Sequence, residues 1–332
     1  MEKTEKIRIT KLKHILSEYS IYFVLLLMVI IMSFATNTFL TKSNILNVLV
    51  SEAGRGILAL GAGLVIISKG IDLSVGSVVS LSAVVSASLV QQSTYTSPIL
   101  PNLGFVPLWT AILAGLAVGA AVGLFNGLIV AYCRVPAFIA TLGGMVIAQG
   151  LALTYTNSYP VPMLRDTYTM FGKIKVLGIP ISILYFIGMA FILWIVLNKT
   201  RFGKNVYAIG GNDSAAEVAG VNVRLNTMMV YVCNGVMAAF VGIILAARTG
   251  SAIATLGDGY ELDAIAAAIV GGVSNNGGVG TVGGMVAGVL ILGILNNGML
   301  LLGISAYAQQ IIKGFIIIIA VVFGVQKSKV KK

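Results

Sequence analysis

Side chains capable of acid–base or nucleophilic chemistry are few in this sequence. The only histidine is His14, in a polar N-terminal segment. The chain has no phosphate-binding GxxxxGK[ST] segment, no Ser/His/Asp set and no metal-ligand spacing. The two cysteines, Cys133 and Cys233, are expected to act as small apolar residues. The sequence therefore predicts no catalytic residue, no metal site and no cofactor, and it excludes ATP hydrolysis by a P-loop of this chain.

Neutral amide side chains lie within the most apolar stretches of the chain. Amides can hydrogen-bond a neutral polyhydroxylated solute without the cost of desolvating a charge. The alternative use of such groups is to join neighbouring helices in lipid. The candidates for a translocation path are Asn126, Gln149, Asn234, Asn296 and Asn297.

Five ionisable side chains also fall within or at the ends of apolar stretches: Glu52, Arg55, Glu261, Asp263 and Lys313. Glu52 and Arg55 are three residues apart, on one face of a helix, and can pair. All five are expected toward the outer side of the membrane, with no lone carboxylate at mid-depth. Because ion-coupled transporters usually have such a carboxylate, the pattern argues against secondary transport.

These side chains belong to a chain that must be solvated by lipid. It has 332 residues, of which 58% are hydrophobic and only 10% charged, against about 25% charged in a soluble domain. We expect an all-α integral membrane protein with about ten transmembrane helices, forming a single membrane domain over residues 1–332. The apolar stretches lie near 17–36, 46–68, 74–92, 108–133, 136–155, 180–197, 226–248, 261–275, 279–302 and 307–325. The stretch 261–275 is short enough to be a broken span.

The distribution of Lys and Arg predicts the orientation in the membrane. With the N-terminal tail (1–16) and the C-terminal tail (326–332) in the cytoplasm, inside segments hold 15 Lys and Arg and outside segments hold 5. Cytoplasmic segments retain basic residues during insertion, so both termini are expected inside. The net charge of +11 is thereby explained by membrane orientation, and no nucleic-acid partner is expected.

One long cytoplasmic segment, residues 198–225, separates two apolar stretches. Within it, residues 213–220 read as a short helix, with Asn212 or Asp213 as the N-terminal cap and Gly220 as the terminator. A loop of this length usually has a function of its own. The alternative is a surface linker between two spans.

A weak internal repeat relates the two halves of the chain. GLFNGLI (123–129) resembles GILNNGML (293–300), and IDLSVG (71–76) resembles YELDA (260–264). Both pairs are offset by five spans, and an odd offset implies a possible inverted 5+5 repeat. Asn126 and Asn297 would then occupy matching places and face a shared axis. Glycines spaced four apart, such as Gly115, Gly119 and Gly123, predict close helix packing or a deformable path lining.

Several segments carry a family resemblance. They are GIDLSVGS (70–77), FIATLGG (138–144), TRFGKNVYAIGGN (200–212), AAEVAGVN (215–222), YELDAIAA (260–267), VGGVSNNGGVGT (270–281) and ILNNGMLLLGISAYAQQIIKG (294–314). They resemble the permeases of bacterial ribose, galactose and xylose ABC importers over nearly the whole chain. The resemblance implies a multi-pass protein of the bacterial cytoplasmic membrane that translocates a monosaccharide. A stand-alone secondary transporter of a small polar solute is the alternative.

The resemblance also implies partners and a coupling helix. The partners are a cytoplasmic ATP-binding subunit, an extracytoplasmic sugar-binding protein and a second permease as a homodimer. The coupling residues map to Asp213, Ala215, Ala216, Glu217 and Gly220. The order Ala-Ala-Glu departs from the Glu-Ala-Ala of importers at large. Residues 200–212 look most like galactose-type permeases and other segments like ribose-type ones, which leaves the sugar open.

Overall fold

The longest apolar segments of the sequence form the longest helices of the molecule. The computed structural model describes residues 20–329, so the N-terminal tail 1–16 and residues 330–332 of the C-terminal tail lie outside it. Within residues 20–329, six helices are long and apolar enough to cross a membrane. They are α3 (Lys42–Ile67), α5 (Leu108–Ala131), α6 (Ala137–Thr156), α8 (Ile181–Lys199), α11 (Val223–Thr249) and α13 (Val282–Leu301).

Shorter elements complete the described chain. They are α2 (Ser20–Ala35), α4 (Val75–Ser88), α7 (Asp166–Lys173), α9 (Arg201–Gly211), α10 (Asp213–Val218), α12 (Tyr260–Val270), α14 (Ala306–Lys329) and a small antiparallel hairpin of β1 (Lys175–Val176) and β2 (Ile179–Pro180). The helical class is as expected. The count of about ten crossings stays a prediction, because α2, α4 and α12 are each shorter than a membrane-crossing helix.

Local residues fix where the long helices begin and end. Proline directly precedes α5, α6 and α8, at Pro107, Pro136 and Pro180. A proline there costs no helical hydrogen bond and sets the backbone for the first turn. At the other end, α11 stops at Gly250, whose φ of +76° is the left-handed conformation that glycine adopts freely.

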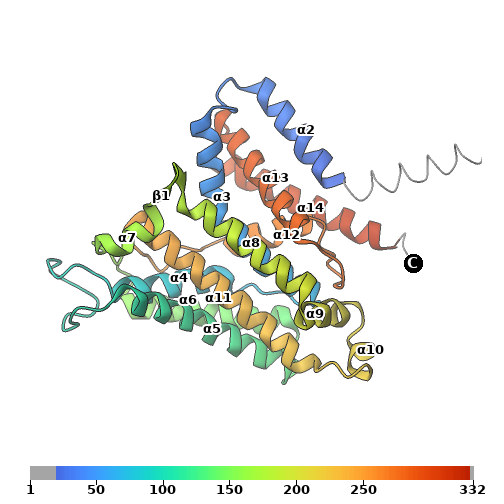
Figure 1. Ribbon diagram of the computed structural model, residues 1–332, viewed down its shortest axis with the longest axis horizontal. Helices are drawn as coiled ribbons and strands as arrows, with labels where there is room; N and C mark the ends of the chain where they lie inside the picture. The colour runs from blue at the N-terminus through green and yellow to red at the C-terminus, as the bar shows by residue number, and fades with distance from the viewer. Residues whose placement is uncertain (1–19, 330–332) are drawn as a thin grey trace, which may run out of the picture.

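The helices pack in two groups (Figure 1). In one, α11 lies along α5 and α4, and α6 packs against α4; in the other, α3 packs against α12 and α13, with α2 beside α13. α3 and α11 contact each other and join the groups. Gly119 of α5 faces the carbonyl of Gly235 on α11 so closely that a Cβ could not fit. The glycine spacing of this segment therefore serves close helix packing.

Two short helices, α4 and α12, begin inside the bundle. Residues 68–74 turn back from the end of α3 and lead into the buried helix α4. The amide of Gly257, three residues before α12, donates to Ser80 Oγ of α4 at 2.9 Å. A Cβ at Gly76 would collide with Glu261 and with the carbonyl of Gly257. The N-terminal ends of α4 and α12 therefore meet, and the stretch 261–275 contains the short helix α12 and the turn that follows it.

Candidate functional site

The predicted short helix of the 198–225 segment is present as α10. Asn212 Oδ1 accepts a hydrogen bond from the amide of Ala215 at 3.0 Å and caps the helix. Gly220 follows the helix with a φ of +84°, as expected for a terminator. The sequence analysis missed a second helix, α9, which begins where Thr200 Oγ1 accepts from the amide of Gly203 at 3.1 Å.

Most of α10 faces solvent. Asp213, Ala215, Glu217 and Gly220 are exposed, while Ala216 is buried and holds the helix to the bundle. Val218, which the sequence analysis did not single out, is 91% exposed. Its exposure could have been predicted from the position of an apolar side chain in the middle of a polar loop. A short exposed helix with one apolar tip is suited to docking in a groove of another protein.

α9 ties this exposed segment to the interior of the bundle. The Tyr207 hydroxyl donates to the carbonyl of Gly280 at 2.8 Å. Burial raises the pKa of the Tyr207 phenol, so it remains a neutral donor. Gly210 lies directly against the carbonyl of Ile67 at the end of α3, and the amide of Gly278 donates to that same carbonyl at 2.8 Å. α9 thus contacts both the end of α3 and the segment before α13.

A cavity of about 540 Å³ lies between α10 and the body of the molecule, and we call it the α10 cavity. Asp213 and Glu217 line it from α10. The charged residues of the opposite walls are Lys69, Arg134 and Arg224. The two carboxylates predicted for coupling therefore lie among cations as well as at the surface.

Three of the five amides join buried elements. Asn126 and Asn234 are 0% exposed. Asn234 Nδ2 donates to Asp72 Oδ2 at 2.9 Å, and Asn126 Nδ2 donates to Ser74 Oγ at 2.8 Å. Gln149 Nε2 donates to the carbonyl of Ala254 at 2.9 Å. All three amides link elements distant in sequence, which is the helix-joining use left open by the sequence.

Asp72 is the residue that the sequence analysis underrated, because no lone buried carboxylate was expected. It is 3% exposed, and its Oδ1 accepts from the Ser74 amide at 2.9 Å and from Ser74 Oγ at 2.6 Å. With Ser74, Asn126 and Asn234 it forms the Asp72 cluster, which fixes the backbone before α4 to α5 and α11. An Asp two residues before a Ser at the start of an apolar helix was the available signal.

The other two amides, Asn296 and Asn297, lie elsewhere. Asn297 and Asn44 exchange two amide hydrogen bonds, each of 2.9 Å, between α13 and α3. The Oδ1 atom of Asn296 is buried without a hydrogen-bond partner among the described residues. Both amides line a cavity between α3, α13 and α14. The expectation that Asn126 and Asn297 face one shared axis is therefore wrong, since Asn126 is enclosed in the Asp72 cluster.

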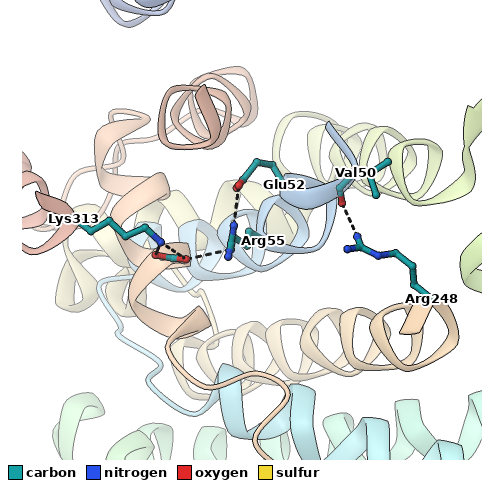
Figure 2. A network of polar contacts seen from close by, with 6 residues as sticks. Val50, Glu52, Arg55, Arg248 and Lys313 are labelled. Atoms are coloured by element: carbon teal, nitrogen blue, oxygen red, sulfur yellow. Dashed lines mark hydrogen bonds and ion pairs between the residues drawn. The ribbon is translucent and has the colours of Figure 1, made fainter. Parts of the chain in front are cut away.

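An ion-pair network crosses from α3 to α12 and α14 (Figure 2). Arg55 Nη1 lies 2.9 Å from Glu52 Oε1, and Arg55 Nε lies 3.2 Å from Asp263 Oδ2. Lys313 Nζ lies 3.4 Å from Asp263 Oδ1. Glu261, grouped with these residues in the sequence, lies instead at the start of α12 against Gly76.

The ion-pair network lies at mid-length of α3, and its depth in the membrane stays a prediction. Arg55 lies 13 residues after Lys42 in a helix of 26 residues, which is about 20 Å along the helix axis. Glu52 and Arg55 are therefore near the middle of α3, rather than toward its outer end. The predicted pairing of Glu52 with Arg55 is confirmed, because it depends only on helical spacing.

Comparisons with known proteins identify the family. Residues 44–321 match the family described as branched-chain amino acid transport system / permease component. The chain is 45% identical to the galactose/methyl galactoside import permease protein MglC of Escherichia coli K12 over 325 residues, 96% of each chain. It is 42% identical to the ribose import permease protein RbsC of the same strain over 308 residues, 91% of this chain and 92% of that one.

The ribose import permease protein RbsC of Bacillus subtilis is 40% identical over 306 residues, 92% of this chain and 91% of the relative. No solved structure matches significantly. The chain belongs to this family of transport-system permease components. It is a multi-pass membrane permease, which is a transporter component rather than an enzyme.

Proposed function

We propose that this chain is the membrane subunit of an ABC importer that moves a monosaccharide of the galactose, methyl galactoside or ribose type across the bacterial cytoplasmic membrane. The similarity to MglC and RbsC over more than nine-tenths of each chain supports this function most directly. Identities of 45% and 42% are too close to choose between the two sugars. A cytoplasmic ATP-binding subunit and an extracytoplasmic sugar-binding protein complete the importer.

The ATP-binding subunit docks on α10 in this proposal. The exposed residues Asp213, Ala215, Glu217, Val218 and Gly220 offer it a short surface. A displacement of α10 can be transmitted to the membrane helices through α9. This helix contacts the end of α3 and the carbonyl of Gly280 ahead of α13. This arrangement supports a coupling role over that of a passive linker.

Both termini are cytoplasmic in the same proposal. Lys69, Arg134 and Arg224 come from three separate segments assigned to the inside, and all three line the α10 cavity. Their gathering at one end of the molecule supports the orientation inferred from the Lys and Arg distribution.

The inverted repeat and the homodimer belong to the proposal as well. An offset of five spans pairs α3 with α11, α4 with α12 and α5 with α13. Each long helix packs on the short helix of the opposite half, α11 on α4 and α3 on α12. The matching polar links are Asn234 to Asp72 and Arg55 to Asp263. A second copy of the permease is expected from the family resemblance.

One observation favours the alternative of a stand-alone secondary transporter, namely the buried carboxylate of Asp72. Its donors, Ser74 and Asn234, are neutral, and together with Asn126 they join the segment before α4 to α5 and α11. We therefore assign Asp72 a positioning role, and the ABC importer remains the proposed function.

Reconstitution tests the proposal. The permease is placed in liposomes with the ATP-binding subunit and the sugar-binding protein encoded by neighbouring genes. We expect ATP-dependent uptake of D-galactose or D-ribose and sugar-stimulated ATP hydrolysis. Uptake by the permease alone, driven by a proton or sodium gradient, would establish the secondary transporter instead.

The coupling surface is tested by Glu217→Lys. Glu217 is exposed, so the free energy of unfolding should change by about 0.5 kcal/mol or less. Sugar uptake and co-purification of the ATP-binding subunit should both be lost, because the reversed charge faces the docked partner. The matched control is Asp166→Lys, another exposed acid near a helix start, on α7. Normal uptake and co-purification by Glu217→Lys would remove α10 as the coupling helix.

A further inference from the structure

Three helices turn polar faces toward one cavity, the α3–α13–α14 cavity, of about 310 Å³. On α3, Asn44, Asn47, Ser51 and Arg55 recur every three or four positions, which places them on a single face, and Glu52 is adjacent to Ser51. α13 adds two neighbouring amides, and α14 adds two polar residues four apart. The polar lining residues are Asn44, Asn47, Ser51, Glu52, Arg55, Asn296, Asn297, Gln309 and Lys313.

Several of these groups have hydrogen-bonding capacity left over. Asn47 and Ser51 are exposed on α3, which is one of the helices able to cross a membrane. Polar groups at this depth are costly against lipid, so they face water or a polar solute.

The charge of the cavity favours a neutral solute. Glu52, Arg55 and Lys313 of the ion-pair network line one wall. Asp263 does not line the cavity, but it pairs with both Arg55 and Lys313. Two carboxylates and two cations give no net formal charge, so the wall neither concentrates ions nor repels an uncharged molecule.

Size and the remaining lining fit a small polyol. Small-molecule pockets usually measure about 300–1,000 Å³, and this cavity is at the lower end of that range. Val48, Leu300 and Leu301 supply an apolar side that can contact the C–H face of a sugar ring. The amides and hydroxyl on the other sides can both donate to and accept from sugar hydroxyls.

We propose that the α3–α13–α14 cavity is a monosaccharide-binding subsite of the permease itself, in which Asn47, Ser51 and the Asn44–Asn297 pair contact the sugar as it passes. The inference rests on the proposed function and specifies where the solute is held. The ion-pair network then positions α12 and α14 around the subsite.

The first test is the double variant Asn47→Leu/Ser51→Leu in the reconstituted importer. Both side chains are exposed, so the change should leave the fold intact. Losing one or two hydrogen bonds to the sugar should lower uptake of D-galactose or D-ribose about tenfold, while ATP hydrolysis stimulated by the loaded binding protein stays within about twofold of wild type. The sugar imported per ATP hydrolysed therefore falls.

The control is Asn198→Leu, which makes the same change at an exposed position of α8, and it should import normally. Unchanged import per ATP in the double variant would overturn the subsite. Equal loss of uptake and of ATP hydrolysis would overturn it as well, because it indicates failed assembly or docking. Failure of the proposed function is distinct, since the wild-type importer itself would then show no sugar-dependent hydrolysis.

A second measurement probes occupancy directly. Ser51→Cys is made in a chain whose Cys133 and Cys233 are replaced by serine and alanine. A water-soluble methanethiosulfonate should modify Cys at this position, and D-galactose or D-ribose added during turnover should slow the modification, whereas sucrose should not. Absence of modification, or equal rates with and without monosaccharide, would contradict a water-filled sugar subsite.

Discussion

The Asp72 cluster and the ion-pair network each join a short helix to a long one, yet they differ in partners and in exposure. Asp72, just before α4, is bound by Asn234 of α11, and Asp263, in the first turn of α12, is bound by Arg55 of α3. Asp72 has neutral donors and is almost fully buried. Asp263 has two cationic partners, and Arg55 and Lys313 line an open cavity.

This difference indicates that the polar groups of the Asp72 cluster stabilise the fold, whereas those of the ion-pair network are suited to transport. A buried cluster with its carboxylate fully hydrogen-bonded stabilises one backbone arrangement. Partly exposed ion pairs beside a cavity can exchange hydrogen bonds with water or with a solute at little cost. We therefore assign the interrupted backbone before α4 to the fixed part of the permease, and the faces of α3, α13 and α14 to the path.

The largest effect is expected for Asp72→Ala. The substitution leaves the Asn234 amide and the Ser74 amide buried without an acceptor. We expect a loss of about 3 kcal/mol or more in the free energy of unfolding, measured by thermal unfolding of the detergent-solubilised permease.

The control for Asp72 is Asp72→Asn, which keeps the shape and one acceptor oxygen and should lose less stability. If Asp72→Ala melts at the wild-type temperature but does not transport, Asp72 takes part in transport and the distinction between the two regions is lost.

A smaller effect is expected for Gly144→Ala in α6. A Cβ at this position would collide with Oδ1 of Asn126 and push that amide out of the Asp72 cluster. Overpacking of this kind costs about 1–3 kcal/mol. The adjacent residue provides a matched control, since a Cβ at Gly143 meets nothing within 4 Å. Equal melting temperatures for Gly144→Ala and Gly143→Ala would show that the Asp72 cluster accommodates the added methyl group without loss of stability.

The smallest effect is expected for Lys313→Met in the ion-pair network. Arg55 remains 3.2 Å from Asp263, so the carboxylate keeps a cationic partner. The Lys313 and Asp263 side chains are also partly exposed, and pairs of this kind contribute about 0–1 kcal/mol. The melting temperature should therefore change little. A loss as large as that of Asp72→Ala would place the network in the fixed part of the molecule.

Much of the fold could be predicted from local sequence. Apolar length placed the long helices to within a few residues, and the Asn212 cap and Gly220 placed α10. α9 was missed because its residues, Arg201–Gly211, include three glycines and read as loop. Its stability comes from tertiary contacts such as that of Tyr207 with Gly280, which local propensity does not reveal.

The sequence by itself determined that the chain is a multi-pass helical membrane protein, because composition and the length of apolar runs report directly on a lipid environment. That it is a permease was implied by the family resemblance of its motifs. It also named the amides at membrane depth. Only the tertiary structure decided which of them are enclosed and which line a cavity. Asn126 and Asn297 look alike in sequence because both have apolar neighbours. Apolar neighbours are found equally around a residue that faces lipid and around one that faces another helix. Their partners, Ser74 and Asn44, lie 52 and 253 residues away, and only folding brings such groups together.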